Sequence, residues 1–161
     1  EGIIENEADG ESPASNVREE SSDTDEVIEM ELNVLDEQLL KACAPLFEQG
    51  KRQKEYGLVL REASVILEGR IRKKAKIKEE IGGNELLGKA FGARGLLIEV
   101  NKKKGTQEAL YGIFRGYFGL IRNDAMHKPE VESSEERTLQ VIGLVDYLLY
   151  LIEKSIYRKG K

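Results

Sequence analysis

From residue 35 onward, apolar residues recur at steps of three and four positions, and polar residues fill the positions between them. This spacing is typical of amphipathic α-helices, which make one turn in about 3.6 residues. It predicts a first helix from residue 35, in which Pro45 causes a kink or starts a new turn and which Gly50 ends. It also predicts a long helix over residues 52–77 and a short one over residues 85–91.

Asn84 is the expected N-terminal cap of the short helix. An irregular, partly apolar connection with room for a brief strand follows over residues 92–105. Thr106 then caps the next helix, which must stop before Pro129, because proline disfavours helical geometry in the residue ahead of it.

The last helix is predicted over about residues 134–157, where Ser133 and Glu136 form the capping box that begins it. Its apolar face is wider than one groove of a bundle requires, which predicts burial among several helices or a face shared with a partner. In the preceding helix, Gly112 and Gly116 lie about one turn apart. Another helix, from this chain or from a second subunit, can approach closely on that side.

These patterns predict one all-α domain, an up-and-down bundle of four to five helices with short connections. A chain of 161 residues has room for one such domain with a real core. We assign residues 32–161 to it. Residues 1–31 are rich in Glu, Ser, Asp and Gly, and we expect a disordered acidic tail or linker, because they cannot bury enough apolar surface to offset the entropy of ordering.

The formal net charge of −5 conceals a division of charge along the chain. Residues 1–31 carry 12 acidic side chains and one arginine, whereas the remaining 130 residues carry 18 acidic and 24 basic side chains. A basic domain attracts nucleic acid electrostatically, although lysines also serve simply to keep helices soluble. The charge pattern alone therefore leaves both interpretations open.

The content of cysteine and histidine excludes several classes of function. Cys43 is the only cysteine, so no disulfide forms within the chain, and we expect a reducing, cytoplasmic compartment. No cysteines and histidines have the spacing of a metal site, so we expect neither a metal nor another cofactor.

The longest apolar run, residues 139–152, is too short to cross a membrane. Because the chain begins with Glu1, we expect a processed product or a piece of a longer protein.

The candidate chemistry lies where the helix that precedes Pro129 ends. Arg122 and His127, the only histidine in the chain, are five residues apart. Arginine stays charged and imidazole titrates near neutral pH, so the pair suits phosphodiester chemistry. On an ideal helix the two side chains point about 140° apart, so they converge only if the helix end is distorted. Asn123 shares a face with His127, and Asp124 is a second residue that can hold the imidazole or pair with Arg122.

Cleavage of RNA without a metal requires a base for the 2′-hydroxyl, an acid for the leaving 5′-oxygen, and positive charge for the phosphorane. One histidine per chain supplies only one of the two proton-transfer groups. A symmetric dimer supplies two histidines and two arginines in one cleft. The alternative is a helix that simply ends in ordinary polar residues before a proline.

Three segments carry a resemblance to a known family. They are the stretch 116–127 with its Arg122 and His127, the stretch Ala44-Pro-Leu-Phe-Glu-Gln-Gly50, and the stretch Glu85-Leu-Leu-Gly-Lys-Ala-Phe91. The motif, an arginine followed by a polar residue and, after a short spacer, a histidine, resembles the signature of the HEPN superfamily. More specifically, residues 35–156 resemble the Ymh-like branch of HEPN proteins, over about three quarters of the chain.

The resemblance implies an all-α bundle that dimerises with the motif at the subunit interface. Many such proteins are metal-independent endoribonucleases that act as toxins or in antiviral defence. By this resemblance Arg122 binds phosphate, His127 is the acid or base, and Asn123 supports them. Two positions depart from the pattern. Asp124 stands where related sequences often have proline, and Pro129 replaces the tyrosine that is nucleotidylated in some silenced toxins.

Two hypotheses of function follow, because a fold by itself does not settle an activity. The first is a dimeric endoribonuclease that leaves 2′,3′-cyclic phosphate and 5′-hydroxyl ends. The alternative is a non-catalytic dimerisation or RNA-binding module of a larger protein, in which an upstream domain or an antitoxin is a further expected partner. The acidic tail is also a candidate inhibitor of the basic domain. The candidate RNA-binding residues are Lys102, Lys103, Lys104, Arg115 and Lys128.

Overall fold

The computed structural model describes residues 36–99, 105–127 and 134–158, without the side chain of His127. The predictions for residues 1–31 lie outside these ranges. The all-α bundle predicted from the periodicity is confirmed. Its elements, in chain order, are α2 (Glu37–Gln53), α3 (Gly57–Ala75), α4 (Gly83–Phe91), β1 (Leu97–Ile98), α5 (Thr106–Tyr117), η1 (Phe118–Arg122), α6 (Asn123–His127), α7 (Glu135–Lys154) and β2 (Ile156–Tyr157).

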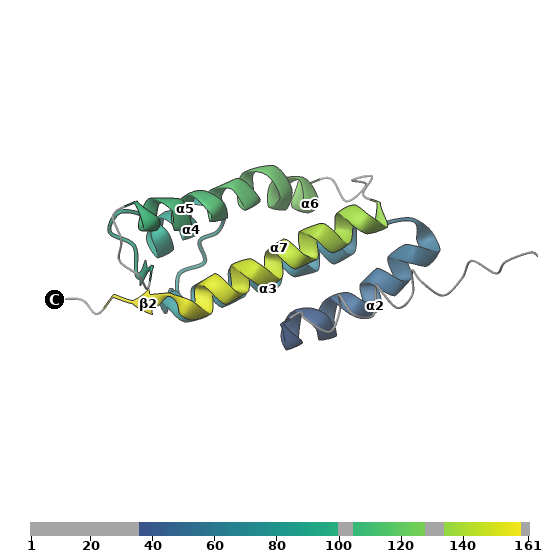
Figure 1. The fold of residues 1–161 in the computed structure, drawn as a ribbon, viewed down its shortest axis with the longest axis horizontal. Helices are drawn as coiled ribbons and strands as arrows, with labels where there is room; N and C mark the ends of the chain where they lie inside the picture. The colour runs from purple at the N-terminus through teal and green to yellow at the C-terminus, as the bar shows by residue number, and fades with distance from the viewer. Residues whose placement is uncertain (1–35, 100–104, 128–133, 159–161) are drawn as a thin grey trace, which may run out of the picture.

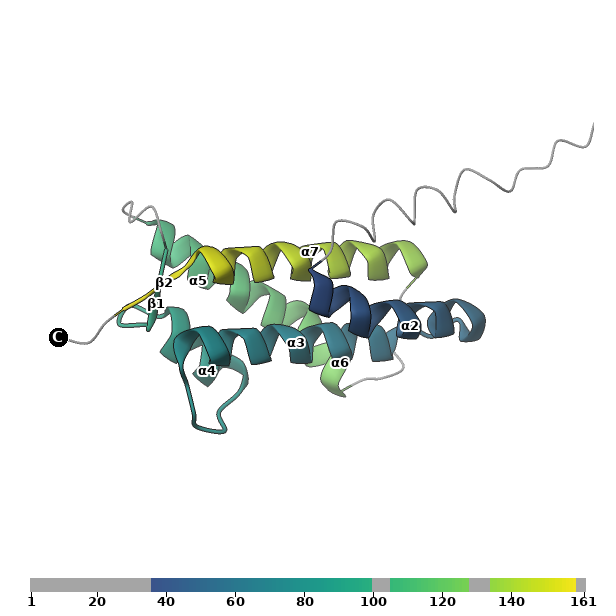
Figure 2. The same ribbon diagram turned by 90° about the horizontal axis from the view of Figure 1, so that it is seen from below.

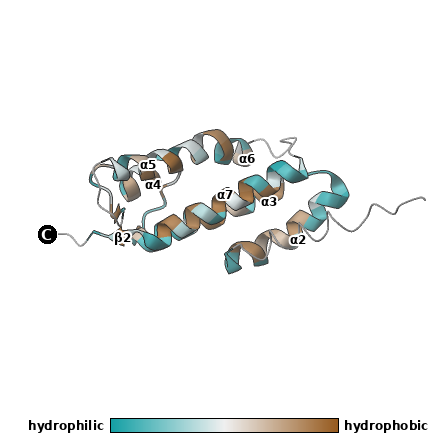
Figure 3. Ribbon diagram, in the orientation of Figure 1, coloured by the Kyte–Doolittle hydropathy of each residue, from teal (hydrophilic) through white to brown (hydrophobic). Residues whose placement is uncertain are grey.

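The helices α3 and α7 run through the middle of the molecule, with α2 on one side of this pair and the helix α5–η1–α6 on the other (Figures 1 and 2). The chain reverses direction from α2 to α3 and from the α5 helix to α7, as in an up-and-down bundle. Hydrophobic and hydrophilic residues alternate along each long helix (Figure 3). No helix in the described ranges is long and apolar enough to cross a membrane.

The core lies between these layers and is rich in phenylalanine. Phe47 of α2, Phe91 of α4, Phe114 of α5 and Phe118 of η1 are among the largest fully buried side chains. The rings of Phe91 and Phe114 stack with their centroids 4.3 Å apart. This contact attaches α4 to α5, which belongs to the helix that carries the predicted motif.

The first helix does not end at Gly50 as predicted, and Pro45 lies inside it. It continues to Gln53 and ends at Lys54, whose backbone is left-handed. Gly50 is required for another reason: a Cβ atom there would lie 2.7 Å from the ring of Tyr56. The chain therefore turns back closely over Gly50, and the next helix begins later than predicted.

The predicted caps are displaced by one or two residues. The cap of α4 is Gly82 and not Asn84, and the cap of α5 is Gly105 and not Thr106. Gly105 has a φ of 85°, a left-handed conformation that favours glycine.

The last helix is capped one residue later than predicted. Its cap is Ser134, whose hydroxyl accepts a hydrogen bond from the N–H of Arg137. Ser133 lies outside the described residues. The helix also ends earlier than predicted, at Lys154.

The residues after α7 pair with the predicted brief strand. The strands β1 and β2 are antiparallel, with Leu97 opposite Tyr157. The backbone N–H of Arg158 also donates to the carbonyl of Leu96. This pairing takes residues 156–157 out of the helix, because their backbone groups bond to a segment sixty residues away in the chain.

Candidate active site

The helix that carries the predicted motif is continuous from residue 106 to residue 127, but part of it is wound more loosely. Phe118–Arg122 forms the π-helical segment η1, in which the N–H of Asn123 donates to the carbonyl of Phe118. Residues five apart point about 140° apart in an α-helix. In a π-helical turn the hydrogen bonds span five residues, so two side chains five residues apart point to nearly the same side of the helix.

Arg122 is anchored to the neighbouring helix α3 by an ion pair that the sequence analysis missed. Its Nε donates to Oε1 of Glu68 at 2.6 Å, and each of the two side chains is only 16% exposed. The guanidinium carbon also lies 6.0 Å from the centre of the Phe118 ring. A partly buried pair of opposite charges interacts more strongly than an exposed pair, because less water screens it.

A second contact joins the same two helices one turn away. The hydroxyl of Ser64 donates its proton to the carbonyl of Leu60 at 2.9 Å. The hydroxyl of Tyr117 lies 2.7 Å from Ser64 Oγ and therefore donates a hydrogen bond to Ser64 Oγ. Burial raises the pKa of Tyr117 to about 12. The phenol therefore stays protonated at neutral pH, as a structural contact.

The π-helical winding explains how both contacts form at once. Ser64 and Glu68 are four residues apart and lie one above the other on the same face of α3. Tyr117 and Arg122 are five residues apart, so regular α-helical winding would turn one of them away from α3. The looser winding between them points both side chains at α3.

The remaining motif residues follow on α6. Asn123 and Asp124 are exposed at its start, and His127 is its last residue. Because α6 is again α-helical, positions 122 and 127 stay about 140° apart. The distortion lies before the pair and not between its members, and any unwinding near Pro129 lies outside the described residues.

Of the candidate RNA-binding residues, the structure describes only Arg115. It is exposed on α5, and its guanidinium carbon lies 5.5 Å from the centre of the Tyr111 ring. Lys102, Lys103, Lys104 and Lys128 lie outside the described residues. Within the described ranges, no three His, Cys, Asp or Glu side chains are grouped as ligands for a metal ion.

The outer face of the helix beside the motif is open at its glycines. A Cβ atom added at Gly112, Gly116 or Gly119 would meet no atom within 4 Å, apart from those of its own helix backbone and chain neighbours. Leu120, next to them, is 79% exposed. A stripe of glycines beside an exposed leucine allows another helix to approach closely.

A family model described as "Protein of unknown function (Hypoth_ymh)" matches residues 33–152 of the chain. The chain belongs to this family. Searches of the curated proteins and of the solved structures found no match. The Hypoth_ymh region includes both helices of the site, with Glu68, Arg122 and His127.

The sequence carries only a weak signal for Glu68. It is the one acidic residue between Leu67 and Ile71, on a stretch of α3 whose other side is fully buried. A carboxylate at the margin of an apolar face is expected to have a partner. Nothing in the spacing, however, identifies that partner as Arg122, 54 residues later.

Proposed function

We propose that this chain is a metal-independent endoribonuclease of the HEPN type, of the kind that acts as a toxin or in antiviral defence. The active site is shared between two subunits of a homodimer, and RNA is cleaved to 2′,3′-cyclic phosphate and 5′-hydroxyl ends. Arg122 carries the proposal, because its guanidinium is anchored through one nitrogen, five residues before the only histidine of the chain.

In this proposal one His127 removes the proton of the 2′-hydroxyl, and the 2′-oxygen attacks the adjacent phosphorus. The bond from phosphorus to the 5′-oxygen breaks, and His127 of the second subunit protonates the leaving oxygen. Arg122 stabilises the charge that develops on the phosphorane oxygens. The separation of positions 122 and 127 around the helix supports a site completed by a second chain.

The open face of the α5 helix supports the choice of a homodimer. Gly112, Gly116 and Gly119 place no side chain in the way of a second copy, and burial of Leu120 removes a large exposed apolar side chain from water. The face reaches Leu120, two residues before Arg122, so a symmetric contact through it brings two motifs near each other.

The first test is cleavage of RNA by purified protein in the presence of a chelator. We expect His127→Ala and Arg122→Ala each to abolish cleavage, while circular dichroism and the oligomeric state stay unchanged. Arg61→Ala, an exposed arginine on α3 without an ion pair among the described residues, is the control and should retain cleavage. Cleavage at the wild-type rate by either motif variant would refute the proposal.

The second test concerns the dimer. Leu120→Arg should give a monomer in analytical ultracentrifugation and should lose cleavage, because each subunit then holds half a site. The control is Val65→Arg, since Val65 is 49% exposed on α3 and apolar as well. A Leu120→Arg protein that still dimerises and cleaves RNA would contradict the placement of the interface.

One observation favours the alternative, a non-catalytic dimerisation or RNA-binding module of a larger protein. Glu68 neutralises the charge of Arg122, and a neutral pair attracts phosphate less strongly. This alternative predicts RNA binding or self-association with no new RNA termini after long incubation. In either case the cytoplasm is the proposed compartment, and an antitoxin or an upstream domain is the proposed protein partner.

A further inference from the structure

We propose that Glu68 is a positioning residue that holds Arg122 ready to bind a phosphodiester through the Nη1 and Nη2 atoms. This inference rests on the proposed ribonuclease function. It assigns a role to a residue on α3, outside the Arg122–His127 motif.

The contact between Glu68 and Arg122 uses one side of the guanidinium. Glu68 Oε1 accepts a hydrogen bond from Nε at 2.6 Å. Among the described residues, no atom accepts a hydrogen bond from Nη1 or Nη2 of Arg122. These two nitrogens form the outer edge of the guanidinium, which binds two oxygens of a phosphate in parallel. Glu68 therefore occupies the nitrogen nearest the helix and leaves the phosphate-binding edge available.

The surroundings restrict the arginine further. Its side chain is largely buried, the Phe118 ring lies 6.0 Å from the guanidinium carbon, and Glu68 is itself fixed on a central helix. A long arginine side chain loses much rotamer freedom when it binds phosphate. A partner that orders the side chain beforehand removes that cost from the binding step.

The winding of the helix is matched to this contact. The π-helical segment allows Tyr117 and Arg122 to reach Ser64 and Glu68 together. The Tyr117 contact locks the rotation of the helix one turn before the motif. Glu68 then sets the direction of the Arg122 side chain. The Tyr117 contact thus positions the helix, and the Glu68 contact positions the guanidinium.

The experiment compares wild type with Glu68→Ala and Glu68→Gln in single-turnover cleavage of RNA. Glutamine keeps an oxygen that can accept from Nε but removes the charge, so we expect it to retain cleavage within about threefold of wild type. We expect Glu68→Ala to cleave at least about tenfold more slowly, because small displacements of a catalytic group are costly. Glu62→Ala, on the same helix and without an ion pair among the described residues, is the matched control and should cleave like wild type.

A spectroscopic readout separates positioning from general damage to the fold. In ¹⁵N NMR spectra, the Nε–Hε signal of Arg122, assigned by its loss in Arg122→Ala, should exchange slowly with water in wild type and in Glu68→Gln. It should broaden or exchange rapidly in Glu68→Ala. Thermal unfolding of each variant identifies any that fails to fold, and Glu68→Gln then provides the comparison.

The outcomes distinguish this inference from the function on which it rests. A wild-type protein that neither cleaves nor binds RNA overturns both. If wild type cleaves RNA and Glu68→Ala cleaves equally fast or faster, only the role of Glu68 is overturned, since Glu68 then restrains Arg122 or is irrelevant to it. An unchanged Arg122 signal in Glu68→Ala, or a Glu68→Gln protein as slow as Glu68→Ala, also overturns the positioning role.

Discussion

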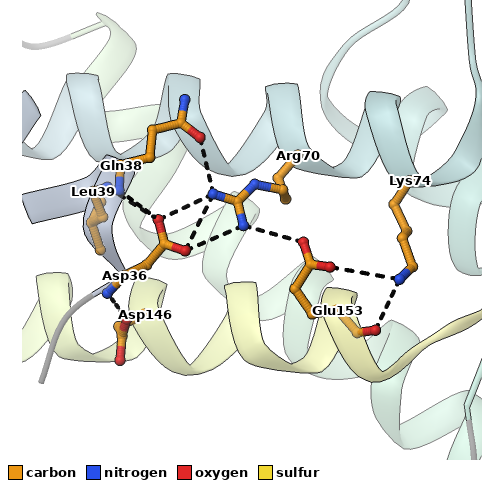
Figure 4. Close-up of polar contacts among 7 residues, drawn as sticks. All are labelled: Asp36, Gln38, Leu39, Arg70, Lys74, Asp146 and Glu153. Carbon is orange, nitrogen blue, oxygen red and sulfur yellow. Dashed lines mark hydrogen bonds and ion pairs between the residues drawn. The ribbon is translucent and has the colours of Figure 1, made fainter.

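Two arginines of this protein are equally buried but bonded in different ways. The side chain of Arg70 on α3 is 17% exposed, and that of Arg122 is 16% exposed. Both Nη atoms of Arg70 donate to the carboxylate of Asp36; Nη1 also donates to Glu153, and Nη2 also donates to the side chain of Gln38 (Figure 4). Within the described ranges, Arg122 uses only Nε, in a single hydrogen bond to Glu68.

The difference concerns which edge of the guanidinium is occupied. Arg70 joins three helices, since Asp36 caps α2 and Glu153 lies on α7 (Figure 4). Two further contacts belong to this junction. Lys74 forms an ion pair with Glu153, and the backbone N–H of Asp36 donates to the carboxylate of Asp146. An arginine whose outer edge is occupied by the protein is structural. One that keeps this edge clear is a candidate for ligand binding, and burial alone would not separate the two.

The largest effect expected from this contrast is on RNA cleavage. Arg122→Ala should abolish detectable cleavage, a loss of at least about 10²-fold to 10³-fold, as when one stabilising donor is removed from an active site. Arg70→Ala, assayed at a temperature where it is folded, should cleave within about threefold of wild type, because its loss leaves the motif unchanged. Gel-based cleavage assays measure both rates. Equal losses in the two variants would erase the distinction between them.

Stability should show the opposite order. Arg70→Ala removes charge-assisted bonds to two carboxylates and leaves partly buried Asp36 without its partner, at a cost of about 3 kcal/mol in the free energy of unfolding. Arg122→Ala should cost about 1–2 kcal/mol, since one bond is lost. Urea denaturation followed by circular dichroism measures both values. A larger loss in Arg122→Ala would show that its contact is mainly structural.

A smaller effect is expected on the pH dependence of stability. Burial raises the pKa of Asp36, but the bonds from Arg70 and from two backbone amides of α2 outweigh burial and lower it below its usual value. A carboxyl of lowered pKa contributes its full stabilisation above its unfolded pKa, near 4, and loses it as the pH falls through the folded pKa. Between about pH 5 and pH 2, wild type should therefore lose stability more steeply than Asp36→Asn.

Urea titrations across this pH range measure the difference between the two proteins. Glu37→Gln is the control, because Glu37 is an exposed neighbour that pairs only with Lys41 among the described residues. Parallel curves for wild type and Asp36→Asn would mean that Asp36 contributes nothing to the acid sensitivity of the junction.

The smallest effect concerns the second contact between α3 and the motif helix. Tyr117→Phe removes the hydrogen bond to Ser64 while keeping the ring, and it should cost about 1 kcal/mol of stability. Cleavage should fall less than in Glu68→Ala, because the anchor of Arg122 itself remains. Chemical denaturation and single-turnover cleavage measure the two effects. A loss of cleavage as large as that of Glu68→Ala would assign the positioning role mainly to Tyr117.

The sequence predicted the helices well because each depends on the spacing of nearby apolar residues. It placed several boundaries wrongly where distant parts of the chain decide them. Gly50 resembles a helix stop, but Tyr56 folds back over it and requires its lack of a side chain. The last helix stops at Lys154, because the residues after it pair with β1.

The candidate site divides in the same way. The pair of Arg122 and His127 was evident from the sequence, because both residue types and their spacing are local features. Cations near the C-terminal end of a helix suit its dipole, but Arg70 and Lys74 on α3 also pair with Glu153 on a different helix. Contacts between residues that are far apart in the chain leave no periodic signal.

By itself, the sequence determined an all-α bundle and marked the helix that carries the motif, because amphipathic periodicity and residue chemistry can be read within a few turns. Only the tertiary structure decided that this helix widens into a π-helical segment and that Glu68 holds Arg122 by one side. The physical reason is packing. The winding of the helix adjusts to Ser64 and Glu68 on α3, and the face that α3 presents is set by the fold as a whole.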